Sequence, residues 1–182
     1  NESGLNQSGT TIKTIFGEQV LAINYREKIL LVHAEGEGYR GVLAVAKVPA
    51  RLGLENAAQL GTIGQTVGEI AEETGGILAM SASRVPETDE GEGALTAGYA
   101  MSGGTGYGEH LDGFAEYGYC RAEIANDNIL SIVPTTDPVG KTCRDAVETQ
   151  PALIVNGAVQ DLSSWTEQNP RACLGQSSRR EM

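Results

Sequence analysis

The sequence predicts an α+β fold: a single domain with a mixed, strand-rich, twisted sheet and a few short helices. Three observations predict it. Apolar runs rich in β-branched residues recur along the chain, as they do in strands. One window, Val67–Thr74, places its apolar residues on one helical face instead. The 24 glycines among 182 residues supply frequent turns, and no internal repeat or linker divides the chain, which favours one domain.

The N-terminal part of the chain has a polar start and then a series of strand patterns. Residues 1–10 are polar and contain glycine, which predicts a flexible leader. Thr11–Phe16 and Val20–Ile23 are rich in β-branched and aliphatic residues and predict two short strands. Lys28–His33 is a continuous apolar run, typical of a strand covered on both faces. Val42–Val48 predicts a further strand.

A short helix is predicted over Val67–Thr74 by signals at both of its ends. Thr66 and Glu69 have the spacing of a capping box, in which the threonine hydroxyl accepts from the Glu69 amide and the carboxylate reaches back. Gly75 is suited to the left-handed position that ends a helix. The apolar run that follows, Ile77–Ser83, predicts a buried strand.

The following part of the chain is predicted to hold short strands separated by loops. Residues 84–97 are acidic and read as a loop, and residues 103–108 are glycine-rich and predict a flexible turn. The strand-like runs are Tyr99–Met101, the segment of Phe114, Tyr117 and Tyr119, and Ile129–Val133, which ends before Pro134.

The C-terminal stretch predicts a hairpin and a further strand. Leu153–Val155 and Ala158–Val159 flank Asn156-Gly157, a pair typical of a type I′ turn because both central residues need positive φ. Arg171 opens another run of small, mostly apolar residues, which we expect to be a strand. Since the chain stops soon after it, we expect the domain over residues 11–182 to be incomplete at its C-terminal end.

The charge and hydropathy of the chain argue against two classes of partner. The formal net charge of -11 repels phosphate backbones and anionic lipid, so we expect no nucleic-acid binding. No apolar stretch reaches the roughly 18 residues of a transmembrane helix, so we expect no membrane insertion.

The three cysteines, Cys120, Cys143 and Cys173, do not form a C-x-x-C motif. A zinc site built on cysteines is therefore not expected. Cys120 and Cys173 have small or apolar neighbours, which is typical of buried thiols. Whether two of the three form a disulfide is left open.

Several motifs that would carry chemistry fail on their spacing. Val139–Thr142 resembles the end of a phosphate-binding loop, but a threonine stands where that loop needs its first glycine. His33 and His110 have no partner serine motif for a nucleophilic triad. Glu109, His110 and Asp112 offer metal ligands, but short clusters of this kind are usually solvated loops. No cofactor is predicted, and a divalent metal is left open.

Three stretches, in order, resemble motifs of the phosphodiester glycosidase family, which includes the enzyme that uncovers mannose 6-phosphate by removing N-acetylglucosamine. Gly64–Ser83 is similar to a "T-V-x-E-x-A" helix that leads into a strand. Gln150–Gly157 is similar to "G-P-x-L-I-x-x-G", and Pro170–Gln176 to "x-R-T-A-I-G". The resemblance spans roughly residues 12 to 176. Two family motifs differ: Ser81-Ala82-Ser83 stands in place of an "N-G-G" turn, and a later "D-G-G-G-S" turn has no counterpart.

The resemblance implies a site that holds a phosphate. Arg171 is the candidate bidentate phosphate clamp, and Ser81 and Ser83 are candidate hydrogen-bond donors at a strand end, with Arg84 beside them. The loop over residues 84–97 would lie over this site. Two alternatives stay open: Arg171 as a surface residue in an ion pair, and the two serines as small residues packed under the loop.

The catalytic residues are not assigned. The usual carboxylate pair of glycosidases cannot be identified, because Asp89, Glu90 and Glu92 lie in an acidic run that reads as solvated. The resemblance implies a hydrolase that acts on a sugar linked through a phosphodiester, on a surface glycan, at an extracellular or cell-surface location.

Two other functions are left open by the sequence. One is a non-catalytic carbohydrate-binding or structural module of a cell-surface or virion assembly, with a second chain completing the sheet. The other is a fragment of an active enzyme.

Overall fold

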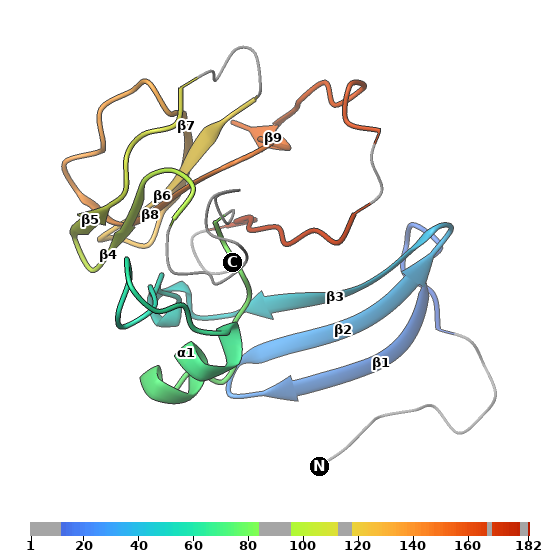
Figure 1. Ribbon diagram of the computed structural model, residues 1–182. Helices are drawn as coiled ribbons and strands as arrows, with labels where there is room; N and C mark the ends of the chain where they lie inside the picture. Colours follow the sequence, from blue (N-terminus) through green and yellow to red (C-terminus); the bar gives the residue numbers. More distant parts are fainter. Residues whose placement is uncertain (1–11, 84–95, 113–117, 167–168, 179–181) are drawn as a thin grey trace. The chain divides into compact units, whose positions relative to one another are not determined.

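The computed structural model describes residues 12–83, 96–112, 118–166, 169–178 and 182. The chain folds as two compact units, Asn1–Leu52 with Gln176–Met182, and Gly53–Gly175. Figure 1 follows the elements of both units along the chain. The leader predicted over residues 1–10 lies outside the described residues. The prediction of a strand-rich α+β fold is confirmed, while the expectation of one domain over residues 11–182 stays a prediction.

The first unit contains a three-stranded antiparallel sheet in the order β1-β2-β3. Glu27 and Lys28, between β1 and β2, both have positive φ, as a type I′ hairpin turn requires. Met182 pairs with Ala46 at the end of β3 through two backbone hydrogen bonds of 2.6 and 3.1 Å. The predicted strands at 20–23, 28–33 and 42–48 are confirmed by the observed strands, β1 (Gln19–Arg26), β2 (Ile29–Gly36) and β3 (Tyr39–Ala46).

The strand predicted over Thr11–Phe16 is wrong for the part of it that is described. Lys13 forms only an isolated bridge with Gln19, and residues 15 and 16 form a turn. The turn is closed by a 3.1 Å hydrogen bond from the Gly17 amide to the Thr14 carbonyl oxygen. Gly17, with φ of 98°, reverses the chain too early for an extended strand to form.

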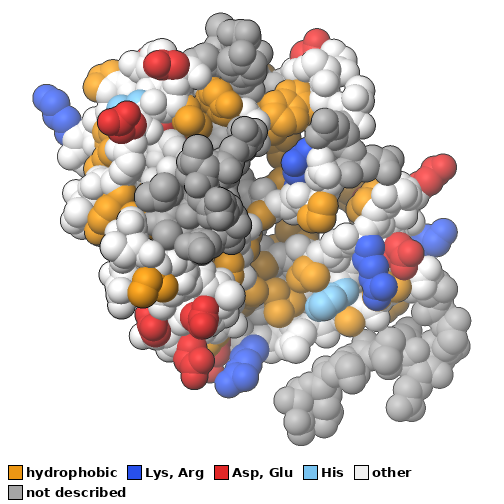
Figure 2. Space-filling model, viewed as in Figure 1, with side chains coloured by type: hydrophobic (Ala, Val, Ile, Leu, Met, Phe, Trp, Pro, Cys, Tyr) orange, Lys and Arg blue, Asp and Glu red, His pale blue; other side chains and the backbone are white. Residues whose placement is uncertain are grey.

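The sheet of the first unit leaves much apolar surface in solvent. Residues 29–32 of β2 are half-buried, so the expectation of a strand fully covered on both faces is wrong. Figure 2 shows hydrophobic side chains reaching the surface of the face that it draws. Those exposed on the three strands include Ile23, Tyr25, Tyr39, Val42 and Leu43.

One α-helix, α1 (Val67–Thr74), is present among the described residues, with the predicted bounds, and a single-turn 3-10 helix, η1 (Pro49–Arg51), precedes it. The capping box is confirmed: the Glu69 amide donates to the Thr66 hydroxyl at 3.2 Å, and the Thr66 amide donates to Glu69 Oε2 at 2.7 Å. Gly75 ends the helix with φ of 68°. None of the described helices is long and apolar enough to cross a bilayer.

The buried strand predicted over Ile77–Ser83 is wrong. Residues 77–82 are exposed, and no strand that the structure describes pairs with this segment. An apolar run forms a strand only where a neighbouring strand accepts its backbone hydrogen bonds, and that partner is a tertiary feature that local composition does not supply.

The second unit contains a five-stranded antiparallel sheet in the order β5-β4-β8-β6-β7, and a separate two-stranded hairpin, β9-β10. Asn156 and Gly157 join the hairpin with φ of 50° and 78°, so the predicted type I′ turn is confirmed. The strands are β4 (Ala100–Ser102), β5 (Thr105–Tyr107), β6 (Cys120–Ala125), β7 (Leu130–Pro134), β8 (Cys143–Thr149), β9 (Ile154–Val155) and β10 (Ala158–Val159).

The sequence predicted two of the five strands of this sheet. The strands predicted at 99–101 and 129–133 correspond to β4 and β7. The glycine-rich stretch over 103–108 was expected to be only a turn, but it contains the strand β5, which pairs with β4. The two central strands, β6 and β8, were not predicted, and the described residues of the expected run around Tyr119 only lead into β6.

The core of the second unit lies on β6 and β8, and its two faces differ. Residues directly opposite one another in an antiparallel pair point to the same face. Ala122 is opposite Val147, and these lie with Cys120 and Ile124 on an apolar face. Arg121 is opposite Glu148, and Glu123, two residues along, shares that face. Both faces are buried, one by apolar side chains and the other by charged ones.

Candidate functional site

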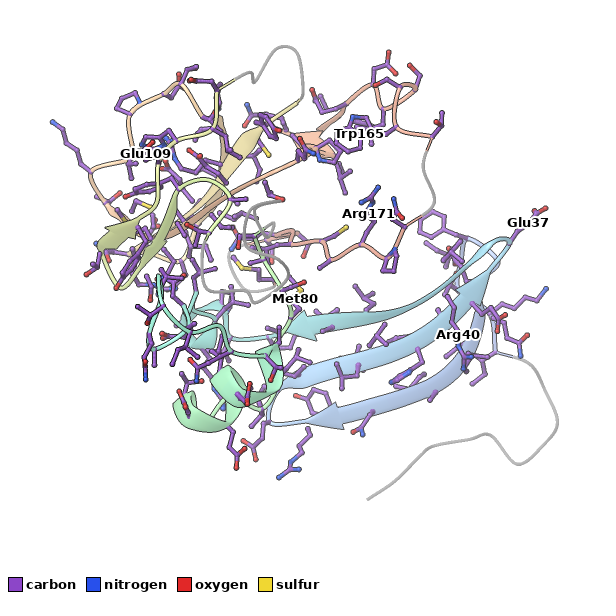
Figure 3. The ribbon with its side chains drawn as sticks, viewed as in Figure 1. Glu37, Arg40, Met80, Glu109, Trp165 and Arg171 are labelled. Atoms are coloured by element: carbon purple, nitrogen blue, oxygen red, sulfur yellow. The ribbon has the colours of Figure 1, made fainter. Side chains whose placement is uncertain are left out.

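The candidate phosphate-binding residues lie in the second unit, but the structure does not join them through contacts. Arg171 is exposed, Ser81 is exposed and Ser83 is half-buried, and Arg84 lies outside the described residues. The strand expected to open at Arg171 is wrong, because residues 169–176 form no strand (Figure 3). Within the described part of the chain, Arg171 makes no hydrogen bond and no ion pair.

A second group of polar residues, centred on Glu148, was not found from the sequence. Glu148 on β8 lies opposite Arg121 on β6, and both side chains are 0% exposed. Arg121 Nη1 lies 3.4 Å from Glu148 Oε1. A buried charge of either sign is costly unless it is paired and hydrogen-bonded, so the two side chains depend on each other.

The guanidinium of Arg121 is fixed on every side. Its Nε donates to Glu123 Oε1 at 2.7 Å, and its Nη2 donates to the Asp137 carbonyl oxygen at 2.7 Å. Its Nη1 donates to the Thr135 carbonyl oxygen at 3.3 Å as well as to Glu148. With these donors engaged inside the protein, Arg121 is a structural cation and not a ligand-binding one.

Glu148 uses both carboxylate oxygens to organise the chain around it. Its Oε2 accepts from the backbone amides of Leu111 at 2.7 Å and Tyr99 at 3.1 Å. Its Oε1 lies 2.6 Å from His110 Nδ1. The carboxylate therefore ties the segment around residues 110 and 111 to β8, and it selects the histidine tautomer with a proton on Nδ1.

His110 is held on a second side by an aromatic ring. Its imidazole stacks on Tyr99, with ring centroids 4.5 Å apart and an interplanar angle of 25°. The side chain is nevertheless 46% exposed. Nε2 makes no hydrogen bond within the described part of the chain, so the imidazole is held through Nδ1 and through its ring face.

Two glycines allow the backbone to pass close to Glu148. Gly98 has φ of 103°, and a Cβ there would lie 2.8 Å from Leu111 Cδ1 and 3.2 Å from Glu148 Cβ. Gly108 has φ of 71°, and a Cβ there would lie 2.5 Å from the Gly98 carbonyl oxygen. A side chain at either position would meet both backbone strain and a steric clash, so these glycines help to place Tyr99 and His110.

The cysteines do not form disulfides in this structure. Burial, reinforced by the charge of Glu148, raises the pKa of Cys120 to about 11. Burial, reinforced by Glu123, raises the pKa of Cys143 to about 11. Cys120 is thus the buried thiol expected from its neighbours, while the same expectation for Cys173 is wrong because Cys173 is exposed.

Metal ligands do not gather in the part of the chain that the structure describes. No group of three or more His, Cys, Asp and Glu side chains there is placed to hold an ion. His110, offered by the sequence as a metal ligand with Glu109 and Asp112, instead pairs with Glu148, 38 residues away in the sequence.

One signal in the sequence could have identified the Glu148 group. The segment that forms β6 alternates charged and apolar residues, with Arg121 and Glu123 on either side of Ala122, and the segment that forms β8 carries charges of both signs, including Glu148. Such alternation normally indicates a strand with one face in solvent. Charges of opposite sign on two pairing strands are equally consistent with a buried ionic face.

Comparison with known proteins finds no relative of this chain. No family model, no curated protein and no solved structure matches the chain.

Proposed function

We propose that this protein is a hydrolase that acts on a sugar linked through a phosphodiester. The observation that carries the proposal is the exposed guanidinium of Arg171, which pairs with no residue that the structure describes. Arg171 lies within Pro170–Gln176, one of the three stretches that resemble the phosphodiester glycosidase family. The proposed substrate is a surface glycan, so the proposed place of action is outside the cell or at its surface.

Arg171 suits a phosphodiester because of its geometry and its charge. A guanidinium offers two parallel N–H donors to a pair of phosphate oxygens, and it stays charged at any physiological pH. No described residue forms an ion pair with Arg171, and the alternative of a surface ion pair stays open. In a chain with net charge -11, an exposed cation is also where an anionic substrate group would be attracted.

The proposed role of the serines is weaker than that of Arg171. Ser81 and Ser83 follow α1 in the first resembling stretch, and neither hydroxyl has a hydrogen-bond partner in the described part of the chain. Both can therefore donate to a ligand. Arg84 belongs to the same proposed set by its position in the sequence.

A non-catalytic carbohydrate-binding module is the second candidate, and one observation favours it. Glu123 and Glu148, the two glutamates that the core of the second unit brings together, both pair with Arg121 and are almost wholly buried. Neither is placed like a solvent-facing glycosidase carboxylate. A binding module needs Arg171 but needs no such pair.

The proposal is tested by measuring the release of free sugar from a synthetic N-acetylglucosamine phosphodiester, with and without a divalent metal. We expect turnover by the unmodified chain, and a loss of about 100-fold in kcat/KM for Arg171→Ala because one charged donor to the substrate is removed. Arg171→Lys should recover only part of this loss, since an ammonium cannot bind two oxygens in parallel.

Lys141→Ala is the matched control, because Lys141 is an exposed cation in the same unit. It should leave kcat/KM unchanged. Binding of the substrate without any release of sugar would replace the hydrolase with the non-catalytic module. Turnover that Arg171→Ala does not reduce would remove Arg171 from the site.

A further inference from the structure

We propose that His110, held by Glu148, is the proton-transfer residue of this hydrolase and acts through Nε2; this inference rests on the function proposed above. Nothing in the sequence resemblance assigns a proton-transfer group. The structure brings together a buried carboxylate, a positioned imidazole and an outward-facing ring nitrogen, which are the parts of a general base.

The tautomer is set by the carboxylate. Glu148 Oε1 accepts from Nδ1 at 2.6 Å, so in the neutral imidazole the lone pair is on Nε2. That lone pair is the one that can accept a proton from water. Because Glu148 Oε2 is bound to the amides of Leu111 and Tyr99, the carboxylate cannot rotate away from the ring without losing two hydrogen bonds.

Three titratable or charged groups of the described residues surround the His110 ring. The titratable and charged groups that face His110 are Glu148 from β8, Tyr99 in the stack, and Arg121 from β6, which shares Oε1 with the imidazole. The adjacent Glu109 and Asp112 are exposed.

Glu148 and His110 differ in their exposure to solvent. Glu148 is 0% exposed and cannot touch a substrate, so it is a positioning residue. The His110 side chain is 46% exposed, which leaves Nε2 open to water and to a ligand. The same split between a buried orienting carboxylate and an accessible imidazole is found in catalytic triads.

One base is sufficient for the chemistry of a sugar phosphodiester. Nε2 accepts a proton from water, and the water oxygen forms a bond to the anomeric carbon. The bond from that carbon to the phosphate oxygen breaks, and the phosphomonoester leaves with the electron pair. The imidazolium then releases its proton to solvent. Because a phosphomonoester dianion is a weak base, with a pKa near 6, its departure needs no separate acid.

The test uses the full chain and compares His110→Asn with the unmodified protein across pH. Asparagine keeps an N–H donor near the position of Nδ1 but has no nitrogen at Nε2. We expect kcat to fall about 100-fold or more with little change in KM, and the pH dependence due to the imidazole to disappear. Added imidazole should restore part of the rate of His110→Asn.

Two further variants separate catalysis from structure. Glu148→Gln should displace the pH dependence of kcat while substrate binding is kept, which a merely structural role would not cause. Glu109→Gln, next to His110 and exposed, is the matched control and should behave like the unmodified chain. An unchanged kcat and pH profile in His110→Asn would overturn the inference and leave the proposed hydrolase standing.

A protein without turnover would instead contradict the proposed function, and a second measurement then decides the inference. The imidazole nitrogens are observed by NMR in histidine-labelled protein during addition of N-acetylglucosamine 1-phosphate. A shift of the Nε2 resonance of His110 would support its place at a phosphosugar site. No shift would overturn it.

Discussion

Glu148 links folding to the proposed chemistry in a single side chain. It accepts from the amides of Leu111 and Tyr99, and it neutralises Arg121 in the interior while it orients His110 at the surface. Each contact restricts the others, because a carboxylate that moved toward one partner would leave another unsatisfied. At the scale of the residue, its position is therefore overdetermined.

Replacing Glu148 should destabilise the protein strongly. Glu148→Ala leaves two buried amides without an acceptor and removes one of the two carboxylates that neutralise Arg121. We expect a loss of about 3 kcal/mol in the free energy of unfolding, measured by urea denaturation. Glu109→Ala should change it by less than about 0.5 kcal/mol. A Glu148→Ala protein as stable as the control would show that the buried pair is dispensable for folding.

The elements that were predicted correctly are specified by residues that lie close together in the sequence. The capping box of α1 needs only Thr66, Glu69 and Gly75, and the β9-β10 hairpin needs only Asn156 and Gly157. These residues act on a backbone a few positions away, so their spacing in the sequence is enough to identify them.

The elements that were missed depend on distant partners. Cys120–Ala125 and Cys143–Thr149 form the centre of a sheet only because they pair with each other and are covered on both faces. Conversely, Ile77–Ser83 has the composition of a strand but no described partner. The pair of His110 and Glu148 was missed for the same reason, since the two residues lie 38 positions apart in the sequence.

At the helix, the capping box predicts a dependence on pH. Hydrogen bonds from the Thr66 backbone, and then from its side chain, lower the pKa of Glu69 below 4.5. The folded pKa is thus below the unfolded one, so the contribution to stability is present above the unfolded pKa and is lost as pH falls through the folded pKa. NMR titration should show the lowered midpoint in the unmodified chain and a partial return toward 4.5 in Thr66→Ala.

Thr66→Ala should also cost about 1 kcal/mol of stability near neutral pH, as the loss of an N-cap does. Glu73→Gln, an exposed substitution in the same helix, is the control and should have almost no effect. An unchanged Glu69 titration in Thr66→Ala would mean that the hydroxyl contributes nothing to the cap.

For the whole molecule, the distribution of burial predicts unequal local stability. In the second unit β6 and β8 are central and buried, whereas the strands of the first unit are half-buried or exposed. Backbone amides exchange with solvent through local or global opening, and the slowest exchange reports the most stable part. The two units therefore need not open together.

Hydrogen exchange measured by mass spectrometry should separate the two units. We expect the slowest exchange in residues 121–124 and 145–148, and exchange faster by at least about tenfold in β1 and β3, which have few buried side chains. The hairpin β9-β10, with only two pairs, is an internal reference for fast exchange. Equal protection in both units would favour the single cooperative domain expected from the sequence.

The charged side chains on the ionic face of the β6-β8 pair could serve the proposed activity more than the stability of the fold. Buried ion pairs replaced as a set by apolar residues of similar volume often leave a protein equally or more stable. Apolar side chains of similar volume in place of Arg121, Glu123 and Glu148 would therefore be expected to give a fold of equal or greater stability. The proposed activity gives this cluster a purpose, because an imidazole at the surface that transfers protons requires a carboxylate beneath it. Part of the interior would then serve the activity and not the stability of the fold.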